Sequence, residues 1–407
     1  MSDPFFLPLK EKAMNYILFD DHSWDQMLPL TFTHPVSELR IGILKIKEKW
    51  EKHLNTEVSF LTRQYLQDKY PANFEKDNIL INSSLIPAIS IIEKIGQLTI
   101  GQAIIYQNRI VAARLSKNEA KDFNFTKDVI RENIPVSDEL RFIDRPWHIF
   151  TYNGEEINND FEILTRGRKS EVLSSTNNFI SQEKIFAEEG VKAEFVTINA
   201  TKGPVYLGKN TEIMEGSAIR GPFALCENSI IKMSAKIYGP TTIGPMSKIG
   251  GEVNNSVIQG FSNKAHDGFL GNSVIGEWCN IGASSNNSNL KNNYANVKLW
   301  SYPENNYINT GLQFCGLIMG DHSKCGINTM FNTGTVVGVC VNLYGSGFPG
   351  NFIPSFSWGG ANNFTIYSMP KAFEVAEKVM AHRNIKFDQK DRLILMEVFK
   401  LTEKSRT

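Results

Sequence analysis

An aliphatic residue recurs at every sixth position from residue 207 to residue 249, without exception. The series consists of Leu207, Ile213, Ile219, Leu225, Ile231, Ile237, Ile243 and Ile249. In an α-helix, six residues advance the chain roughly 240° past a whole turn, so these side chains would scatter around the axis. A six-residue period is typical of a β-helix, in which each short strand buries one aliphatic residue against the coil below. The sequence therefore predicts a parallel β-solenoid over residues 186–370.

The period is interrupted twice. After the stretch EVNNSV the inward positions are predicted to be Val257, Asn263, Phe269, Ile275 and Ile281, with Asn263 as the one polar member. The second interruption covers residues 284–314, and the period then returns at Met319, Cys325, Phe331, Val337 and Leu343. A long excursion between intact coils is predicted to be a loop, and such loops commonly carry function. Residues 371–407 are predicted to form a helical tail that covers the exposed last coil.

The first 185 residues follow a different pattern, of short apolar strands alternating with helical stretches. Strands are predicted over residues 15–20, 58–62 and 78–82, with a helix that begins near Ser37 and a hairpin that turns near Asn108. This order predicts an α/β domain with a doubly wound, mostly parallel sheet, which binds ligands at the carboxyl ends of its strands. Met14 is an alternative start, and the sequence leaves open whether residues 1–13 are native.

Composition narrows the kinds of ligand. The 407 residues include 43 basic and 43 acidic side chains, and this balance argues against a nucleic-acid or membrane-surface partner. No apolar run approaches the roughly 18 residues of a membrane span, and no secretory signal is recognisable. Five scattered cysteines without CxxC spacing predict neither a disulfide framework nor a metal site. We therefore expect a cytoplasmic protein with small-molecule ligands.

The stretch NKAHDGFLGNSVIGEWCNIGASS, residues 263–285, carries a family resemblance. Hexapeptide repeats with KAH…LG…VIG…NIGA resemble the bifunctional N-acetylglucosamine-1-phosphate uridyltransferase/glucosamine-1-phosphate acetyltransferase family. That family joins a nucleotidyltransferase domain to a left-handed parallel β-helix in the same order. The resemblance implies a homotrimer with acyl-transfer sites between subunits, acetyl-CoA as acyl donor and an amino-sugar phosphate as acceptor.

The resemblance also implies roles for individual residues. His266 matches the catalytic histidine that takes a proton from the sugar amine, and imidazole is the side chain suited to accept a proton near neutral pH. Lys264, Asn280 and Asn289 match substrate-binding positions, whereas Ala283 matches a backbone contact to the acetyl group. One departure is a phenylalanine at position 269 where the family has tyrosine. The alternative interpretation, a solvated turn histidine among turn-forming asparagines, stays open.

The N-terminal domain resembles sugar-phosphate nucleotidyltransferases less completely. LPLTFTHP, residues 28–35, is similar to the PLT…P part of their signature, but no glycine occurs from residue 19 to residue 40, and Val36 replaces the expected lysine. Asn82 and two serines stand where the family has a Mg²⁺-binding aspartate, which leaves Mg²⁺ open as a cofactor of this domain. The candidate residues for an altered nucleotide site are Asp20, Asp21 and Arg40. Their alternative interpretation is a capped turn and a solvated helix face.

Three hypotheses follow. The first is an acetyl-CoA-dependent N-acetyltransferase, coupled to a nucleotidyltransferase-like domain that binds a nucleoside triphosphate, for synthesis of a UDP-N-acetylglucosamine-type nucleotide sugar. The second is a sugar-1-phosphate nucleotidyltransferase whose β-helix is only a trimer scaffold. The third is a non-catalytic regulatory subunit that senses a nucleotide sugar.

Overall fold

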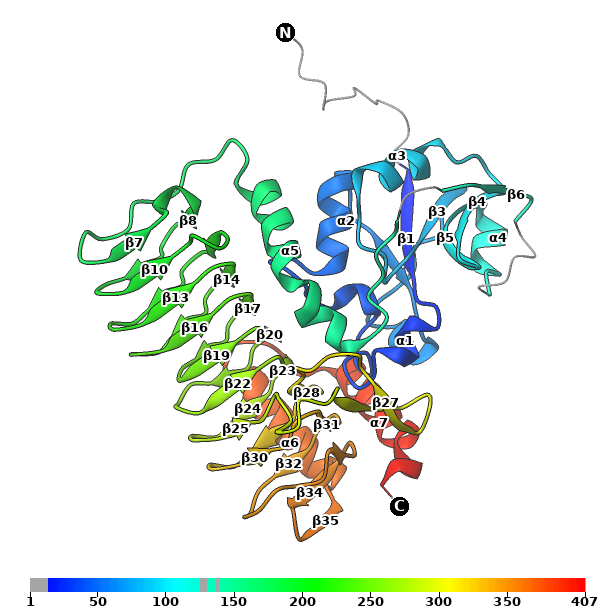
Figure 1. Ribbon diagram of the computed structural model, residues 1–407. Coiled ribbons are helices and arrows are strands. Elements are labelled where there is room, and N and C mark those ends of the chain that lie inside the picture. The colour runs from blue at the N-terminus through cyan, green and yellow to red at the C-terminus, as the bar shows by residue number, and fades with distance from the viewer. Residues whose placement is uncertain (1–13, 125–129, 137–138, 407) are drawn as a thin grey trace. The chain divides into compact units, whose positions relative to one another are not determined.

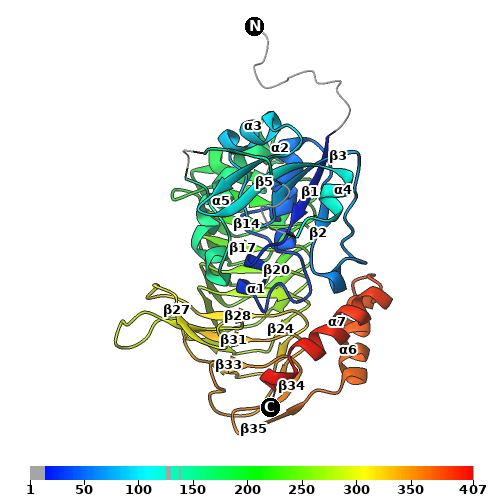
Figure 2. The same cartoon turned by 90° about the vertical axis from the view of Figure 1, so that its right-hand side faces the viewer.

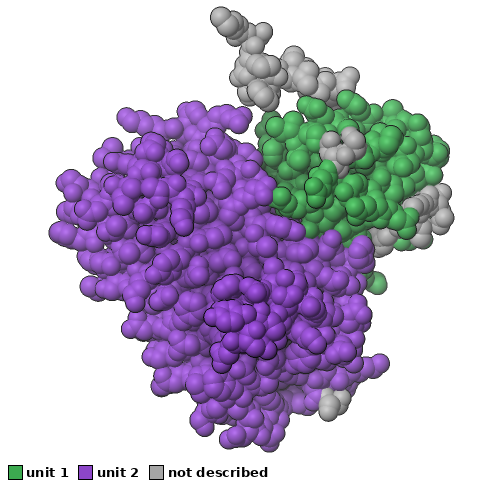
Figure 3. Space-filling view, in the orientation of Figure 1, with its two compact units in different colours: residues 1–21, 47–142 green, residues 22–46, 143–407 purple. Residues whose placement is uncertain are grey.

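The computed structural model describes residues 14–124, 130–136 and 139–406 (Figure 1). The candidate extension before Met14 lies outside these residues. The chain divides into two compact units: residues 1–21 with 47–142 form the first, and residues 22–46 with 143–407 form the second (Figure 3). The domain borders expected at 185/186 and 370/371 stay predictions.

The first unit is built on a six-stranded mixed sheet. Across the sheet its strands are β2 (Ser59–Leu61), β1 (Asn15–Phe19), β3 (Asp77–Asn82), β5 (Arg109–Ser116), β4 (Gln102–Tyr106) and β6 (Glu132–Ile134). The pairs β1–β2 and β1–β3 are parallel, as the alternation of strands and helices predicts. The predicted hairpin is also present as the antiparallel pair β4–β5, and β5 runs antiparallel to β3 as well. The pair β4–β6 is parallel again, so the described sheet is mixed, with three parallel and two antiparallel pairs, and the predicted majority of parallel pairs is confirmed.

Among the described residues of this unit, three α-helices accompany the sheet: α2 (Ile46–Leu54), α3 (Ile89–Gln97) and α4 (Lys117–Lys121). Trp50 of α2 is fully buried, and its indole N–H donates to the carbonyl of Leu85, 3.0 Å away. The helix predicted to begin near Ser37 begins instead at Ile46, because residues 36–38 form only one 3₁₀ turn. The reason is that residues 22–46 pack with the second unit, as described below.

The second unit is dominated by the predicted parallel β-solenoid, which has three sheets as faces (Figure 1). The first face contains β7 (Asn178–Ile180), β10 (Thr197–Asn199), β13 (Ala218–Arg220), β16 (Lys236–Tyr238), β19 (Glu252–Asn254) and β22 (Phe269–Gly271). The second face contains β8 (Ile185–Ala187), β11 (Val205–Leu207), β14 (Phe223–Leu225), β17 (Thr241–Ile243), β20 (Val257–Gly260), β23 (Val274–Glu277), β28 (Leu317–Met319), β31 (Thr335–Val337) and β33 (Phe352–Ile353). The third face contains β9 (Lys192–Ala193), β12 (Glu212–Ile213), β15 (Ile230–Ile231), β18 (Lys248–Ile249), β21 (Asn263–Lys264), β24 (Asn280–Ile281), β29 (Lys324–Cys325), β32 (Asn342–Leu343), β34 (Ser357–Gly360) and β35 (Asn363–Ile366).

The six-residue series supplies the solenoid core as predicted. From Leu207 to Ile249 every member of the series is at most 1% exposed and belongs to one hydrophobic cluster. Parallel pairing places Leu207 beside Leu225 and Leu225 beside Ile243, so equivalent side chains stack from coil to coil. The five inward positions predicted after the long excursion also belong to this cluster.

The register between the two interruptions was predicted wrongly by one residue at three positions. The inward residues there are Ile258, Lys264 and Leu270, in place of Val257, Asn263 and Phe269. The cause is the length of two successive corners: the chain takes four residues from Ile249 to Val253 and five from Val253 to Ile258. Lys264, and not Asn263, is therefore the polar residue of the inward series.

The second face of the solenoid is covered by other parts of the same unit. Helix α5 (Pro146–Thr165) packs along β14, β17, β20 and β23. Ile157 of α5 and Ile43 join a hydrophobic cluster with Phe186 and Tyr206 on the outer side of this face. We call residues 22–46 the strap; they include the short helix α1 (Ser23–Gln26).

The excursion between coils is ordered. It contains β25 (Asn286–Asn287), which pairs with β30 (Met330–Phe331), and a hairpin of β26 (Lys298–Ser301) and β27 (Asn306–Asn309) that projects from the solenoid (Figure 2). Trp300 of the hairpin stacks on Phe352, and Tyr302 lies edge-on between Phe352 and Phe32 of the strap. The hairpin is thus held by the last coils and the strap.

The predicted helical tail consists of α6 (Met369–Ala381) and α7 (Gln389–Leu401), which lie beside the solenoid strands (Figure 2). Arg383 donates to the Asn263 side chain at 3.1 Å, whereas Phe399 contacts Phe356 of a late coil. The tail therefore follows the flank of the solenoid instead of covering only its last coil. Within the described residues, no helix has the length and apolar character needed to cross a bilayer.

We expect Ile243→Ala to lower the free energy of unfolding of the second unit by about 2–5 kcal/mol, because it opens a cavity in the stacked core. Lys236→Ala, on the exposed side of β16, is the control and should change it by less than about 0.5 kcal/mol. Thermal unfolding followed by circular dichroism measures both. Equal midpoints in the two variants would contradict the inward packing of Ile243.

Candidate functional site

His266 lies on the corner formed by residues 265–268, where the chain passes from β21 on the third face to β22 on the first. Its side chain is exposed and outside the hydrophobic core, as predicted. Gly268 closes the corner with φ near +124°, and a Cβ there would lie 2.1 Å from the Ser285 carbonyl oxygen of the next coil. The corner therefore requires glycine at this position and presents the imidazole to solvent.

Lys264 points inward beneath this corner. It is paired in register with Ile249 and is 3% exposed. Its Nζ donates to the Gly250 carbonyl oxygen at 2.9 Å and to the His266 carbonyl oxygen at 2.5 Å. Burial lowers the pKa of the Lys264 amine to about 8, against an opposing contribution from Asp267. In this structure the ammonium faces backbone carbonyls, whereas the resemblance implies a substrate phosphate.

Ala283 lies on the equivalent corner of the next coil. The Ser284 N–H donates to the Asp267 carbonyl oxygen at 2.8 Å, so the two corners stack directly. Asn280 is exposed on β24, on the third face, in register with Asn263 and Lys324. The structure thus places His266, Ala283 and Asn280 on neighbouring coils of one edge.

Asn289 does not join this group. Its Nδ2 donates to Asn272 Oδ1 at 2.8 Å, and Asn272 follows β22 at the corner between the first and second faces. Phe269, at the position where the family has tyrosine, is half-buried on β22 in register with Glu252. The predicted residues are therefore divided between two corners of the solenoid.

Asp20 and Asp21 lie at the carboxyl end of β1 in the first unit, where a sheet of this kind binds ligands. Asp20 Oδ2 accepts a 2.5 Å hydrogen bond from the Thr62 hydroxyl. Asp21 Oδ2 accepts from Arg109 Nε at 2.7 Å and from Asn82 Nδ2 at 2.9 Å. Both carboxylates are therefore already engaged by protein groups.

Arg109 was not among the residues predicted from the sequence. Its guanidinium pairs with both oxygens of Asp21, donates to Ser84 Oγ at 2.6 Å, and lies 4.1 Å from the centre of the Phe142 ring. The sequence offers a weak signal, because Arg109 directly follows the turn of the predicted hairpin. We call Asp21, Asn82, Ser84 and Arg109 the sheet-end cluster.

Arg40 is not part of the sheet-end cluster, and it does not lie on a helix as predicted. Its backbone N–H donates to Gln259 Oε1 at 2.6 Å, and Gln259 Nε2 donates to the Arg40 carbonyl oxygen at 3.1 Å. The Arg40 guanidinium also donates to the Ile43 carbonyl within the strap. Arg40 therefore belongs to the second unit, where it anchors the strap to β20.

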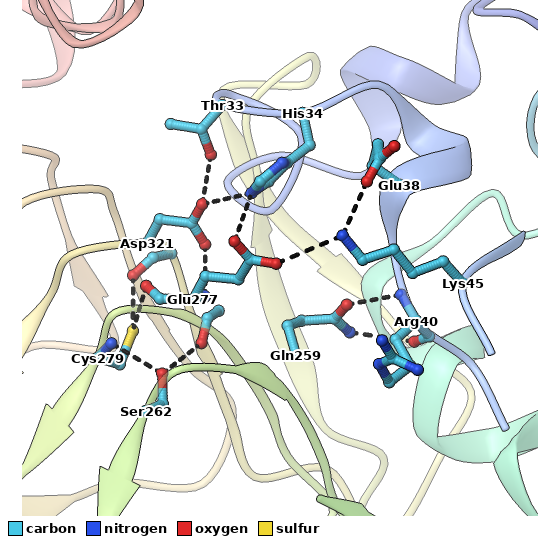
Figure 4. Close-up of polar contacts among 12 residues, drawn as sticks. Thr33, His34, Glu38, Arg40, Lys45, Gln259, Ser262, Glu277, Cys279 and Asp321 are labelled. Atoms are coloured by element: carbon cyan, nitrogen blue, oxygen red, sulfur yellow. Dashed lines mark hydrogen bonds and ion pairs between the residues drawn. The ribbon is translucent and has the colours of Figure 1, made fainter. Parts of the chain in front are cut away.

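A buried polar network joins the strap to the solenoid (Figure 4). His34 Nε2 lies 2.6 Å from Asp321 Oδ2, and the Thr33 hydroxyl donates to the same oxygen at 2.6 Å. Lys45 Nζ lies 2.8 Å from Glu38 and 3.7 Å from Glu277, whose other oxygen lies 3.9 Å from His34. In this network the cationic groups, His34 and Lys45, belong to the strap. The carboxylates come from the strap, as Glu38, and from the solenoid, as Glu277 and Asp321.

The charges of this network shift pKa values in opposite directions. Burial by itself would lower the pKa of His34, but Asp321 and Glu277 outweigh it and raise this pKa. Burial likewise opposes ionisation of Asp321, yet His34 and Thr33 bring the pKa of its carboxyl down to about 2. The His34 contribution to stability is full below about pH 6.5 and is lost as the pH rises through its folded-state pKa. The Asp321 contribution is present above about pH 3.9 and is lost as the pH falls towards 2.

We expect His34→Ala to lower the free energy of unfolding of the second unit by about 3–5 kcal/mol near pH 5, because it leaves Asp321 buried without its cation. The loss should be smaller at pH 9, where the wild-type imidazole is itself less protonated. Thermal midpoints at the two pH values measure the effect, with His22→Ala, exposed on the same strap, as control. An equal loss at both pH values would show that His34 acts through packing alone.

Comparison with known proteins finds a family match in the N-terminal part of the chain. Residues 16–169 match a family described as sugar nucleotidyl transferase. The matched range includes the whole sheet-end cluster and the strap.

A curated relative is the bifunctional sugar-1-phosphate nucleotidylyltransferase/acetyltransferase of Sulfurisphaera tokodaii. The two chains are 36% identical over 145 residues, which are 35% of this chain and 36% of the relative. The match thus spans about a third of the length of that curated relative. Together, the two sequence matches support the resemblance to the bifunctional family.

Two solved structures of UDP-N-acetylglucosamine acyltransferases are also similar. The Arabidopsis enzyme is 13% identical with a TM-score of 0.25, covering 58% of this chain and 92% of its own. The Francisella novicida enzyme is 12% identical with a TM-score of 0.20, covering 55% of this chain and 87% of its own. Both TM-scores are low, so the description of the fold given above depends only on the strand pairing observed in this chain.

Proposed function

We propose that this protein is an acetyl-CoA-dependent N-acetyltransferase of amino-sugar phosphates, with glucosamine-1-phosphate as the expected acceptor. The proposal includes the coupling of this reaction to a sugar nucleotidyltransferase-like unit, for synthesis of a UDP-N-acetylglucosamine-type nucleotide sugar. The observation that carries it is the exposed imidazole of His266, presented outside the hydrophobic core on a corner that stacks on Ala283.

In the proposed reaction His266 is the general base. The sugar amine attacks the thioester carbonyl, a C–N bond forms, the C–S bond breaks, and coenzyme A leaves as a thiolate. His266 takes the proton that the amine nitrogen must lose and returns it to the thiolate. A base positioned in this way accelerates proton transfer about 10²- to 10⁴-fold.

Ala283, Asn280 and Asn289 keep their predicted roles as part of the proposal. The Ala283 backbone contacts the acetyl group, and Asn280 contacts the sugar from the adjacent strand. Asn289, at a different corner of its own chain, fits a substrate contact if the site lies between subunits of a homotrimer. Sedimentation analysis of the assembly addresses this arrangement, because the expected trimer has three times the mass of one chain.

Mg²⁺ does not fit the sheet-end cluster. Asp21 is paired with a guanidinium, Asn82 is neutral, and hard divalent cations require several free oxygen ligands. In the part of the chain that the structure describes, no group of three His, Cys, Asp or Glu side chains is arranged to hold a metal ion. We therefore assign no metal-dependent step to the first unit.

A cytoplasmic location stays a prediction from the sequence.

We expect His266→Ala to lower the rate of acetyl transfer by at least about 10²-fold, because the amine loses its base. The thermal midpoint should not change, since the side chain is exposed and outside the core. Thiol release from acetyl-CoA with glucosamine-1-phosphate measures the rate, and His382→Ala, an exposed histidine beyond α6, is the matched control. Wild-type turnover by His266→Ala would remove His266 from the mechanism.

The sheet-end cluster favours a second candidate for the first unit, namely binding of a nucleotide sugar without nucleotidyl transfer. The Asp21–Arg109 pair occupies the strand ends, and the strap that resembles the nucleotidyltransferase signature is committed to the solenoid. This second candidate corresponds to the hypothesis of a regulatory subunit that senses a nucleotide sugar. Release of pyrophosphate would instead support the hypothesis of a nucleotidyltransferase whose solenoid is only a scaffold.

The second candidate predicts that UDP-N-acetylglucosamine raises the thermal midpoint of the protein by mass action, without pyrophosphate release from UTP and a sugar-1-phosphate. Arg109→Ala should abolish this shift, since it disrupts the sheet-end cluster, whereas Lys94→Ala on the surface of α3 should preserve it. Differential scanning calorimetry and a pyrophosphate assay measure the two properties. Turnover with UTP would restore nucleotidyl transfer to the first unit.

A further inference from the structure

A charged side chain occupies an inward position that is apolar on the neighbouring coils. Ile213, Ile231 and Ile249 precede Lys264 along the inner side of the third face, and Ile281 follows it. Lys264 is as inaccessible as these isoleucines. Burying an ammonium costs free energy unless hydrogen bonds compensate, so a lysine here requires a structural or chemical reason.

The reason lies in the unequal lengths of two stacked corners. The chain needs four residues to pass from Ile249 to Val253, but six from Lys264 to Leu270. The longer corner contains His266 and has no equally long corner beneath it for support.

The Lys264 ammonium lies at the step between these corners. Its two acceptors are the carbonyl oxygen of Gly250, on the shorter corner, and that of His266, on the longer one. Gly251 leaves room for it, because a Cβ at this position would lie 2.9 Å from Nζ. One side chain thus connects the two coils directly at the residue that presents the imidazole.

We propose that Lys264 is a positioning residue: its ammonium ties the His266 carbonyl to the Gly250 carbonyl and thereby fixes the direction of the imidazole. This inference rests on the acetyl transfer proposed above and gives Lys264 a role through His266, without contact to the sugar phosphate. The tie stabilises the orientation in which His266 meets the amine, and a displacement of about 1 Å at a reacting group costs up to about 10²-fold in rate.

The chain offers a matched control. Lys324 Nζ donates to the carbonyl oxygen of His322 at 2.8 Å, which is the same kind of contact at another corner. Lys324 is also partly buried on the third face, but it does not occupy the inward series, where its neighbour Cys325 lies. Removing its ammonium tests the general effect of losing a lysine–carbonyl contact.

The experiment compares Lys264→Met with Lys324→Met in the full-length protein. Methionine keeps an unbranched apolar chain, so Lys264→Met should fold with an unchanged or higher thermal midpoint. We expect its kcat for acetyl transfer to fall about 10²-fold while KM for acetyl-CoA changes less than about twofold. Lys324→Met should retain wild-type kcat. Lys264→Gln, whose amide carries two N–H donors, should recover part of the lost kcat.

Two further measurements separate positioning from general damage. In the His266→Ala background, Lys264→Met should have no additional effect on the residual rate, because it acts only through His266. Hydrogen exchange followed by mass spectrometry should show faster exchange of amides in residues 265–271 in Lys264→Met alone. This second measurement does not depend on enzymatic activity.

The outcomes distinguish the two proposals. Full kcat in Lys264→Met, with His266→Ala inactive, would overturn the positioning role and leave the acetyl transfer intact. Wild-type turnover by His266→Ala would overturn the proposed function, and the exchange measurement would still decide whether Lys264 fixes the corner. A further loss of rate in the double variant, beyond that of His266→Ala, would also overturn positioning through His266.

Discussion

Stacking of one inward aliphatic residue on its equivalent in the next coil is the constraint on which the second unit depends. Parallel pairing keeps Leu207, Leu225 and Ile243 in line, and every core position repeats this arrangement on one of three faces. Because most inward positions are apolar and the strands must stay in register, the chain can change freely only at the corners. A functional group such as the His266 imidazole is therefore found at a corner, where adding or removing residues leaves the core unchanged.

Packing on the solenoid also explains why the strap lacks the glycines of a nucleotide-binding loop. A nucleotide-binding loop would need backbone N–H groups that are free to close on phosphates, which glycine permits. The strap instead uses its backbone and side chains on the solenoid: Arg40 pairs with Gln259, and His34 with Asp321. The part of the strap that contains His34 and Arg40 is held by a buried ion pair and by backbone contacts, and it has no glycine before Gly42. The missing glycines and the packing against the second face are thus consistent with each other.

Much of this architecture could be predicted from local pattern. The six-residue series identified the core, and the hairpin of β4 and β5 and the helical tail were visible in the sequence. The strap was not, since its partners Glu277 and Asp321 are more than 230 residues away along the chain. The sheet-end cluster was missed for a similar reason: Arg109 and Asp21 are 88 residues apart in the chain, and the strand order β1, β3, β5 brings them to the same end of the sheet. Side-chain partners of this kind are set by topology, which a single sequence does not display.

The register between the two interruptions shows how a small error changes a chemical interpretation. Side chains alternate between the two sides of a strand, so a shift of one residue exchanges the inward and outward positions. With Asn263 inward, Lys264 would face outward as a ligand for phosphate. The pairing of Ile249 with Lys264 instead turns the lysine into the core, and its ammonium must find acceptors there. Its two acceptors are carbonyl oxygens of the two unequal corners. The short corner of one coil and the buried lysine of the next coil therefore occur together. The corner that presents His266 is therefore held in place by a buried residue beneath it, Lys264.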